Sequence, residues 1–423
     1  MYITQPEREK VVLIGTVLPK KTRSDAEETL AELSLLAESA GTEVVEKFIQ
    51  KLQSFDPAFF IGKGKAEQIS AEVNFLGADT VIFDDDLSPA QMKNLEKVLK
   101  KKIIDRTGLI LEIFAQNAQT REAKTQVELA HLEYLLPRLT RQWVHLERQI
   151  GGIGVRGGMG ETQLEVDRRL TRKRIRKLKE QLVSIENQRN IRKKGRRDRF
   201  KATLIGYTNA GKSTLFNSLT ESKVLTADRL FATLDSTMRR LSINSHKEMV
   251  LLADTVGFIR KLPHNLIASF RSTFGVVRDA DLLLAVIDIS YPNYEEHIDA
   301  VNTVLKEMGL SDKPLRYIFN KIDLLEDEDI IKAARRQYKN SEFISASRGI
   351  GLRKVLESIS DQYKKDFLIK EYTLDISDTK TIADLYNTGH VLDQKYNGEL
   401  TTLKVRLSLE NAAKLNYINN IQK

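Results

Sequence analysis

The sequence predicts an α/β protein made of a small parallel α/β domain, a long antiparallel helical hairpin, a second α/β domain and a small α+β domain. Short β-rich runs alternate with helical patterns at the N-terminus and again beyond residue 200. Between these regions lie two long helical patterns joined by a glycine-rich loop. Strand–helix alternation is typical of parallel sheets covered by helices. The predicted domains are 1–116, 117–192, 193–365 and 366–423.

The first domain shows three strand patterns, each followed by a helical one, and a fourth short strand. Ser24 is the expected cap of the first helix, and Ser88 with Pro89 at the first helical position opens the third. The predicted strands are 11–17, 44–50, 80–86 and 102–105, and the predicted helices are 24–39, 63–77 and 88–101.

The hairpin is predicted from two helical patterns, 120–139 and 161–190. In the second, Ile175, Leu178, Leu182 and Ile185 have the spacing of a coiled-coil seam. Six of the eleven residues that follow Ile150 are glycine, which indicates a flexible tip. In the last domain, strands are expected at 367–374 and 400–409 and helices at 381–387 and 410–418.

Composition and charge narrow the function. The chain of 423 residues contains no cysteine, which excludes disulfides, thiolate metal sites and catalytic thiols. It shows no signal peptide and no apolar run of membrane-spanning length, so we expect a cytoplasmic protein. The net charge is +9, but residues 168–201 hold sixteen Lys or Arg against three acids. Such a basic arm indicates a polyanionic partner, either nucleic acid or an anionic membrane surface.

A phosphate-binding loop is predicted where an apolar strand meets a helix. Gly206, Gly211, Lys212 and Ser213 fit the pattern G-x4-G-K-[ST]. The backbone N–H groups of such a loop point at phosphate oxygens. Lys212 is expected to reach the β- and γ-phosphates, and the Ser213 hydroxyl to bind Mg²⁺, a hard cation that prefers oxygen.

Three further motifs follow in order, each at a predicted strand end. D-x-x-G supplies Asp254, which can hold Mg²⁺ through a water, and Gly257, whose amide can meet the γ-phosphate. N-K-x-D supplies Asn320 and Asp323, whose carboxylate matches the N1–H and N2–H₂ donors of guanine but not of adenine. The loop 345–347 places backbone groups near guanine O6. Together the motifs predict a guanine-nucleotide site with GTP hydrolysis.

Two positions near these motifs bear on catalysis. Thr233 is the candidate that closes on Mg²⁺ when a γ-phosphate is present, and Thr237 is its rival. The position after D-x-x-G, where Ras-like GTPases have a water-positioning glutamine, is Phe258. We therefore expect slow intrinsic hydrolysis that a partner stimulates.

The motifs and the N-terminal half resemble the HflX family of translational GTPases. The matching segments are FIGKGKAEQI, IFDDDLSPAQ, DRTGLILEIFAQNAQTREAKTQVELAHLEYLLPRL, GGIGVRGGMGETQLEVDRR, GYTNAGKS, FATLD, DTVGF and NKID. The resemblance implies a P-loop GTPase domain and binding to the large ribosomal subunit, with a role in splitting or rescuing stalled ribosomes under stress. One departure is Ser236, where the family usually has proline.

These observations together assign roles to residues. We expect Lys212, Thr233 and Gly257 to be catalytic, and Mg²⁺ to be held by Ser213, by Thr233 and, through water, by Asp254. The expected GTP-binding residues are Gly206, Tyr207, Thr208, Asn209, Ala210, Gly211, Lys212, Ser213, Phe231, Ala232, Thr233, Leu234, Asp235, Asp254, Thr255, Val256, Gly257, Asn320, Lys321, Ile322, Asp323, Ser345, Ala346 and Ser347. The expected RNA contacts are Arg156, Arg172, Lys173, Arg174, Arg176 and Lys177.

Alternatives remain at this stage. The protein could be a ribosome-assembly or dormancy factor that uses GTP as a timer, or a signalling GTPase on a membrane surface. Against the latter, the basic helix lacks the bulky apolar face that enters a membrane interface. The glycine-rich loop is either a mobile tip that orders against ribosomal RNA or a second phosphate site. The expected partners are GTP or GDP, the large ribosomal subunit and its RNA, with no stable membrane insertion and a monomeric chain.

Overall fold

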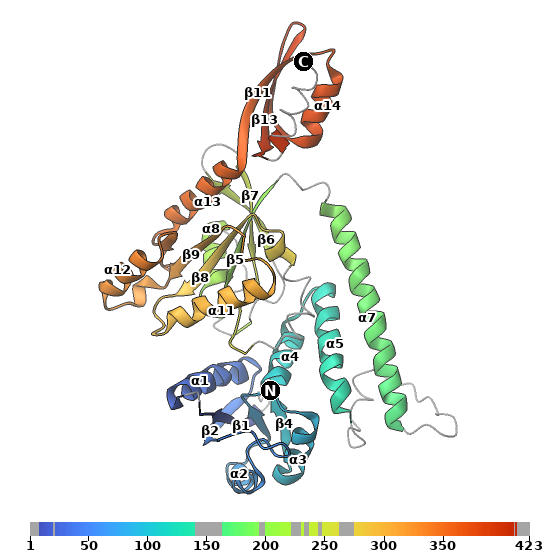
Figure 1. Cartoon of the computed structure of the whole chain (residues 1–423), viewed down its shortest axis with the longest axis vertical. Helices are drawn as coiled ribbons and strands as arrows, with labels where there is room; N and C mark the ends of the chain where they lie inside the picture. Colours follow the sequence, from blue (N-terminus) through green and yellow to red (C-terminus); the bar gives the residue numbers. More distant parts are fainter. Residues whose placement is uncertain are drawn as a thin grey trace, which may run out of the picture.

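The computed structural model is an elongated α/β molecule in which four units follow one another along the chain (Figure 1). The N-terminal sheet lies at one end and the C-terminal sheet at the other, with the larger sheet between them. The predicted fold class is confirmed. The residues that the structure describes are 8–19, 22–139, 163–193, 199–220, 230–231, 237–243, 248–261, 275–409 and 411–412.

The N-terminal unit is a parallel sheet of four strands in the order β2-β1-β3-β4. The two central strands are buried because their residues are almost all apolar. The elements are β1 (Lys10–Val17), α1 (Arg23–Ser39), β2 (Glu43–Lys51), α2 (Lys63–Phe75), β3 (Thr80–Phe83), α3 (Pro89–Leu99), β4 (Lys102–Asp105) and α4 (Arg106–Asn117).

Helix caps in this unit follow the expected chemistry with one correction. Ser88 caps α3 in a capping box, and Pro89 occupies the first turn. The cap of α1 is Thr22, however, and not Ser24. Thr22 accepts from the Asp25 amide, and the Asp25 carboxylate accepts from the Thr22 amide, so the reciprocal pair starts the helix earlier. Helix α4, which begins directly after β4, was not among the predicted elements.

The middle unit pairs α5 (Arg121–Leu135), continued by the short turn η1 (Leu136–Arg138), with α7 (Gln163–Lys193). The two helices lie side by side (Figure 1). Three of the four predicted seam residues are in the contact: Leu178 is buried against α5, and Ile175 and Leu182 pack beside it. Ile185, the fourth, is not part of this cluster. The glycine-rich segment lies outside the described residues.

The third unit is a six-stranded sheet in the order β10-β9-β8-β5-β7-β6, in which only β6 runs antiparallel to its neighbour. Its central strands are buried apolar runs, as expected for a sheet covered on both faces. The elements are β5 (Phe200–Gly206), α8 (Lys212–Thr220), β6 (Thr237–Ile243), β7 (Glu248–Asp254), α10 (Gly275–Arg278), β8 (Leu282–Asp288), α11 (Tyr294–Glu307), β9 (Leu315–Asn320), η3 (Ile322–Leu324), α12 (Glu328–Gln337), β10 (Ser341–Phe343) and α13 (Leu352–Asp366).

The C-terminal unit is an antiparallel sheet in the order β11-β13-β12, and its first strand follows α13 without a loop. Alternate residues of the central strand, Leu403, Val405 and Leu407, are buried in one cluster with Leu385 of the helix. The elements are β11 (Phe367–Asp375), α14 (Thr379–Thr388), β12 (His390–Asn397) and β13 (Leu400–Ser408). Strand β12 was not predicted, and most of the expected helix 410–418 lies outside the described residues.

One hydrophobic cluster joins the first and third units. Side chains of α4, among them Leu109 and Phe114, share it with Phe231 and Phe258 of the third unit. The rings of Phe114 and Phe231 meet edge to face, with centroids 4.7 Å apart. Such aromatic pairs stabilise by about 0.5–1.5 kcal/mol beyond the area they bury. The N-terminal unit is therefore packed directly against the predicted nucleotide site.

Candidate functional site

The loop from Gly206 to Gly211 joins the end of β5 to the start of α8, and both glycines are required by their surroundings. Gly206 has a φ of +144°, and a Cβ there would collide with the carbonyl oxygen of Val286 in β8. Gly211 has a φ of +91°, and a Cβ there would collide with the Asn320 amide. Only glycine combines these angles with such close approach. The loop thus has the strand–loop–helix context that phosphate binding requires.

Lys212 is the buried cation of this loop. Its side chain donates to the Tyr207 carbonyl at 2.7 Å, and only 6% of the residue is exposed. Burial lowers the pKa of Lys212 to about 8, although the nearby Asp254 carboxylate acts in the opposite direction. Gly257 packs so closely that a Cβ there would lie 2.9 Å from the Lys212 ammonium. The predicted catalytic pair Lys212 and Gly257 is therefore brought together.

Ser213 and Asp254 form the oxygen-rich part of the site. The Ser213 hydroxyl donates to Asp254 Oδ2 at 2.6 Å, and Asp254 is fully buried. Burial raises the pKa of Asp254, opposed by the Ser213 hydrogen bond and the Lys212 charge. The other carboxylate oxygen, Oδ1, has no hydrogen-bond partner among the described residues. A hydroxyl beside a carboxylate with a spare oxygen fits Mg²⁺ or its bound water.

Asn320 ties the separate loops together. Its amide donates to the Ala210 carbonyl at 2.9 Å and accepts from the Ala346 amide at 2.9 Å. It therefore joins the phosphate loop to the 345–347 loop. The neighbouring Lys321 has a left-handed φ of +66° and pairs with Asp288 at 2.7 Å. That pair fixes the lysine stem beside the predicted base site.

Asp323 has the properties needed to recognise a base. Its Oδ2 lies 3.2 Å from Arg348 Nε, while Oδ1 is buried and has no hydrogen-bond partner among the described residues. A hydrogen bond from Ser345 is the main cause that lowers the pKa of Asp323. The carboxylate is therefore an ionised acceptor, as guanine N1–H and N2–H₂ require.

The structure describes only part of the region expected to contact the γ-phosphate. Phe231 is buried with a φ of +58°, and its ring lies against Phe114. Thr237 begins β6, opposite Asp254 on β7. Ala232, Thr233, Leu234 and Asp235 lie outside the described residues, as does Arg156, so their assigned roles stay predictions.

Phe258 is 1% exposed and belongs to the apolar cluster shared with α4. Its backbone contacts the phosphate loop. The Phe258 amide donates to the Gly206 carbonyl at 2.9 Å, and its carbonyl accepts from the Thr208 amide at 2.8 Å. The segment after D-x-x-G is thus attached to the phosphate loop.

Comparisons with known proteins agree with this geometry. The N-terminal region matches a family described as GTP-binding GTPase N-terminal over residues 27–115, and the next matches its middle region over 117–196. Residues 201–321 match the family described as 50S ribosome-binding GTPase. A GTPase HflX of Magnetococcus marinus is 42% identical over 412 residues, which cover 96% of this chain and 94% of that relative. This chain belongs to the HflX family of GTPases.

A second curated relative agrees with this assignment. A GTPase HflX of Escherichia coli strain K12 is 48% identical over 353 residues, covering 82% of this chain and 81% of that relative. Among solved structures, the SsGBP and GDP complex is 27% identical with a TM-score of 0.48, covering 84% of this chain and 99% of that one. Membership in the HflX family makes the chain a P-loop GTP hydrolase. Phe258 is the hydrophobic residue at the usual glutamine position.

The basic arm of this HflX-family chain is displayed on α7. Four of the predicted RNA contacts are exposed there, namely Arg172, Lys173, Arg176 and Lys177. Arg174 differs, since it makes a bidentate ion pair with Glu128 of α5, at 2.6 and 2.8 Å. That pair holds the two helices together. No helix in the described part of the chain is long and apolar enough to cross a membrane.

Sequence reasoning missed the contacts that the N-terminal unit makes with the nucleotide site. Glu32 of α1 accepts from the Tyr207 hydroxyl at 2.6 Å, and Asn117 donates to the Phe231 carbonyl at 2.9 Å. The only signal in the sequence was the acidic run that begins at Asp84, which matched the family but had no assigned role.

Proposed function

We propose that this GTPase binds the large ribosomal subunit and splits or rescues stalled ribosomes under stress, with its nucleotide state controlling its affinity for the ribosome. The observation that supports this most directly is the exposed basic face of α7 in the same chain as the GTP site. The matched description of the GTPase domain as 50S ribosome-binding points to the same partner. The function requires a cytoplasmic protein.

RNA binding through α7 follows from charge and shape. Lysine and arginine side chains neutralise phosphates and release counterions, which supplies affinity independently of base sequence. A single helix that exposes these four cations can follow an RNA backbone. Binding is therefore expected to be strong at low salt and to recognise the shape of the ribosomal RNA.

The nucleotide site supplies the control. Lys212 and the amides of the loop from Gly206 hold the phosphates, and Asp323 selects guanine. Ser213, Asp254 through water, and Thr233 are the residues that would hold Mg²⁺, which when bound neutralises charge on the phosphates. Gly257 and Thr233 contact the γ-phosphate in this scheme, so that GTP and GDP favour different conformations of the adjoining loops.

Sedimentation of ribosomes tests this function. Purified protein is mixed with intact ribosomes and GTP, GDP or a non-hydrolysable GTP analogue, and the profile is recorded. We expect free subunits, with the protein on the large one, in GTP and in the analogue. Stable binding to one subunit without splitting indicates an assembly or dormancy factor. Absence of ribosome binding in every nucleotide contradicts the proposal and favours action at a membrane surface.

A further inference from the structure

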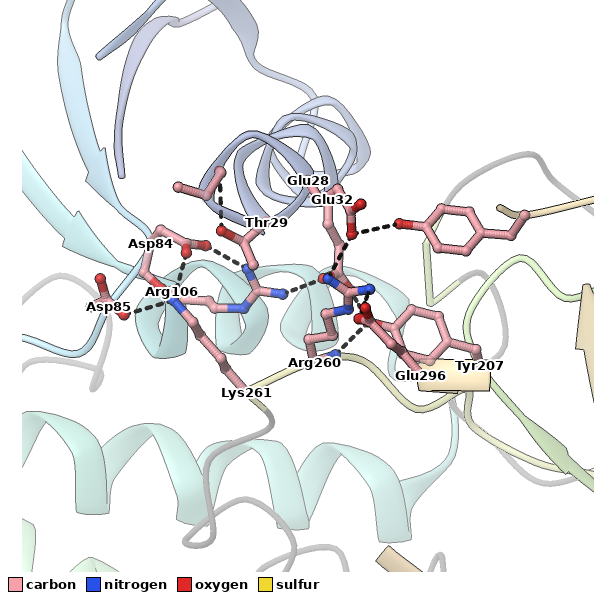
Figure 2. Close-up of polar contacts among 12 residues, drawn as sticks. Glu28, Thr29, Glu32, Asp84, Asp85, Arg106, Tyr207, Arg260, Lys261 and Glu296 are labelled. Carbon is pink, nitrogen blue, oxygen red and sulfur yellow. Dashed lines mark hydrogen bonds and ion pairs between the residues drawn. The ribbon is translucent and has the colours of Figure 1, made fainter. Parts of the chain in front are cut away.

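A network of ion pairs and hydrogen bonds attaches the N-terminal domain to the segment that follows D-x-x-G (Figure 2). Lys261 lies four residues beyond Gly257. Its ammonium donates to Asp84 Oδ2 at 2.6 Å, to Asp85 Oδ1 at 2.6 Å and to the Asp84 carbonyl at 3.3 Å. All three acceptors belong to the N-terminal domain, so that domain binds the ammonium of a lysine whose side chain remains 27% exposed.

Lys261 is bound at the edge of the N-terminal sheet where sheets of this kind normally bind their ligands. The strand order β2-β1-β3-β4 reverses between β1 and β3. Open α/β sheets bind their ligands at such a reversal, outside the carboxyl ends of the strands. Asp84 and Asp85 directly follow β3, and Thr16 near the end of β1 donates to Asp85 at 2.7 Å. The lysine therefore occupies the position of a ligand.

A buried arginine extends the network to the phosphate loop. Arg106 is 1% exposed, and its guanidinium lies 2.6 Å from Asp84 and 2.9 Å from Glu32. Glu32 in turn accepts from the Tyr207 hydroxyl at 2.6 Å, and Tyr207 is part of the phosphate loop. Arg106 thus holds the two carboxylates that contact Lys261 and Tyr207 (Figure 2).

Arg260 completes the attachment. Its amide donates to the Tyr207 hydroxyl at 2.6 Å, and its guanidinium pairs with Glu28 of α1 at 3.1 Å and with Glu296 of α11 at 2.5 Å. We call Glu28, Glu32, Asp84, Asp85, Arg106, Tyr207, Arg260 and Lys261 the docking network. Through it, the phosphate loop and the segment after D-x-x-G share contacts with one rigid domain.

The backbone at the contacts is strained. Phe231 and Lys261 have φ angles of +58° and +53°, a region that side-chain-bearing residues rarely adopt. Both are held by the N-terminal domain: Lys261 by the carboxylates, and Phe231 by the amide of Asn117. Strain that the surroundings impose is relieved when those surroundings change.

From these contacts we propose that Arg260 and Lys261 are positioning residues that couple the N-terminal domain to the nucleotide. Docking of this domain onto the GTPase domain and binding of a γ-phosphate then oppose each other. In the arrangement seen here, the Thr208 amide donates to the Phe258 carbonyl and the Lys212 ammonium to the Tyr207 carbonyl. A γ-phosphate accepts from the Lys212 ammonium and the Gly257 amide. Its binding therefore displaces the segment after D-x-x-G, which the docking network holds.

The consequence is a reciprocal coupling. If docking weakens binding of the γ-phosphate, a γ-phosphate must weaken docking by the same factor. Loss of the Lys261 contacts therefore raises the affinity for a GTP analogue relative to GDP. Coupling factors of this kind are typically about 5-fold to 150-fold. The inference rests on GTP binding and not on any action at the ribosome.

The experiment uses the full chain without ribosomes. Since the chain has no cysteine, Glu72→Cys on α2 and Asp361→Cys on α13, both exposed, provide two labelling sites for energy transfer. The distance between the domains is measured with GDP and with a non-hydrolysable GTP analogue. Dissociation constants for both nucleotides are measured in parallel. In the wild type we expect the distance to increase in the analogue.

The variants separate charge from packing. Lys261→Gln keeps most of the side-chain stem but loses the ammonium, and we expect its preference for the analogue over GDP to rise at least about fivefold. The charge exchange Lys261→Asp with Asp85→Lys is expected to reverse at least half of that rise. Lys332→Gln, which loses a surface pair with Asp329 on α12, is the matched control and should match the wild type.

The results decide between coupling and a merely structural contact. A distance that is the same in both nucleotides, or a preference in Lys261→Gln within twofold of the wild type, overturns the proposal. So does a rise that the charge exchange fails to reverse, because the effect then comes from local packing. Failure of ribosome splitting with the coupling intact contradicts only the proposed function.

Discussion

The two parallel α/β domains differ most at the carboxyl ends of their strands. In the GTPase domain this edge carries the phosphate loop, the buried Lys212 and the Asn320 bridge. In the N-terminal domain the same edge carries carboxylates, and Asp84 with Asp85 surrounds a lysine from the GTPase domain. One architecture thus binds phosphates in one case and a protein cation in the other. Its function comes from the residues at the strand ends and not from the fold.

Backbone strain separates the two domains as well. Of the six described residues other than glycine with positive φ, four are in the GTPase domain: Asn209, Phe231, Lys261 and Lys321. Such conformations cost about 1–3 kcal/mol each and persist where surrounding contacts impose them. The GTPase domain therefore holds more of this strain than the N-terminal domain, where only Phe60 and Lys100 among the described residues other than glycine have positive φ.

The largest expected effect tests whether base recognition belongs to the GTPase edge alone. Asp323→Asn removes the acceptor for guanine N1–H and N2–H₂ and should shift preference from GTP to XTP by on the order of 10⁴-fold, as for other buried hydrogen-bonding sites. Competition binding with GTP, XTP and ATP measures it. Asp86→Asn neutralises a carboxylate at the N-terminal edge that accepts from Thr107, and should leave the base preference unchanged. Retained GTP preference in Asp323→Asn would refute the assignment.

The base site could be predicted from sequence because its parts are local. Asn320 and Asp323 stand at the end of an apolar strand, and Gly206 ends another. Each motif is a few residues long and depends on the strand before it. The seam residues of α7 were predictable for the same reason, since a helical repeat records its buried face.

The contact between the domains could not be predicted in this way. Arg106 and Glu32 are 74 positions apart, and Lys261 and Asp84 are 177 apart. Ion pairs over such separations leave no period or spacing in the sequence. Helix α4 was missed because its apolar residues are nearly continuous, which gives no clear helical period. Strand β12 was missed because its residues are mostly polar.

The second prediction extends the comparison to α7. We expect this helix, and not the strand ends of either sheet, to bind RNA. Replacing Arg172, Lys173, Arg176 and Lys177 with Gln should weaken large-subunit binding by on the order of 10- to 100-fold and lower the log–log salt slope by somewhat under one per lost contact. Binding is measured by sedimentation at several salt concentrations. GTP affinity without ribosomes should not change.

Arg174→Gln serves as the matched comparison for that set. Because Arg174 is paired with Glu128, its replacement should lower the stability of the hairpin. The salt slope of ribosome binding should change less than it does in the fourfold variant. Thermal unfolding and salt-dependent binding are recorded together. A salt slope that the fourfold variant leaves unchanged would exclude α7 as the RNA-binding surface.

The third prediction concerns hydrolysis at the GTPase edge. With Phe258 at the usual glutamine position, no side chain there orients water, so we expect slow intrinsic hydrolysis and at least about 10-fold stimulation by large subunits, or about 1.4 kcal/mol. Single-turnover assays with and without subunits measure it. Phe258→Leu is the informative variant, because the buried ring belongs to the apolar cluster and Phe258→Ala would cost about 3–5 kcal/mol.

Two outcomes would contradict that account. The first is that the free protein hydrolyses GTP as fast as the ribosome-bound protein, and the second is that Phe258→Leu removes most of the activity of the free protein. The first would mean that the site is already complete. The second would make the ring itself part of catalysis, despite its position in the apolar cluster.

The smallest effect is a pH dependence that follows from the burial of Lys212. With a pKa of about 8, the Lys212 ammonium loses its proton as the pH rises through about 8, and the neutral amine no longer attracts phosphate. A bound phosphate favours the ammonium, so the complex stays protonated where the free protein does not. GDP affinity should therefore fall as the pH rises, by about fourfold between roughly pH 6.5 and 8.5.

Lys212→Arg is the control for this effect, since a guanidinium remains charged across that range. Its GDP affinity is expected to be constant with pH because the guanidinium stays charged. It should be weaker than that of the wild type, because the planar guanidinium is bulkier than the compact ammonium in a loop this close. Titration of fluorescent GDP at several pH values compares the two proteins. If wild type and Lys212→Arg lose affinity in parallel, another group titrates, and burial of Lys212 does not set the pH dependence of the GTPase edge.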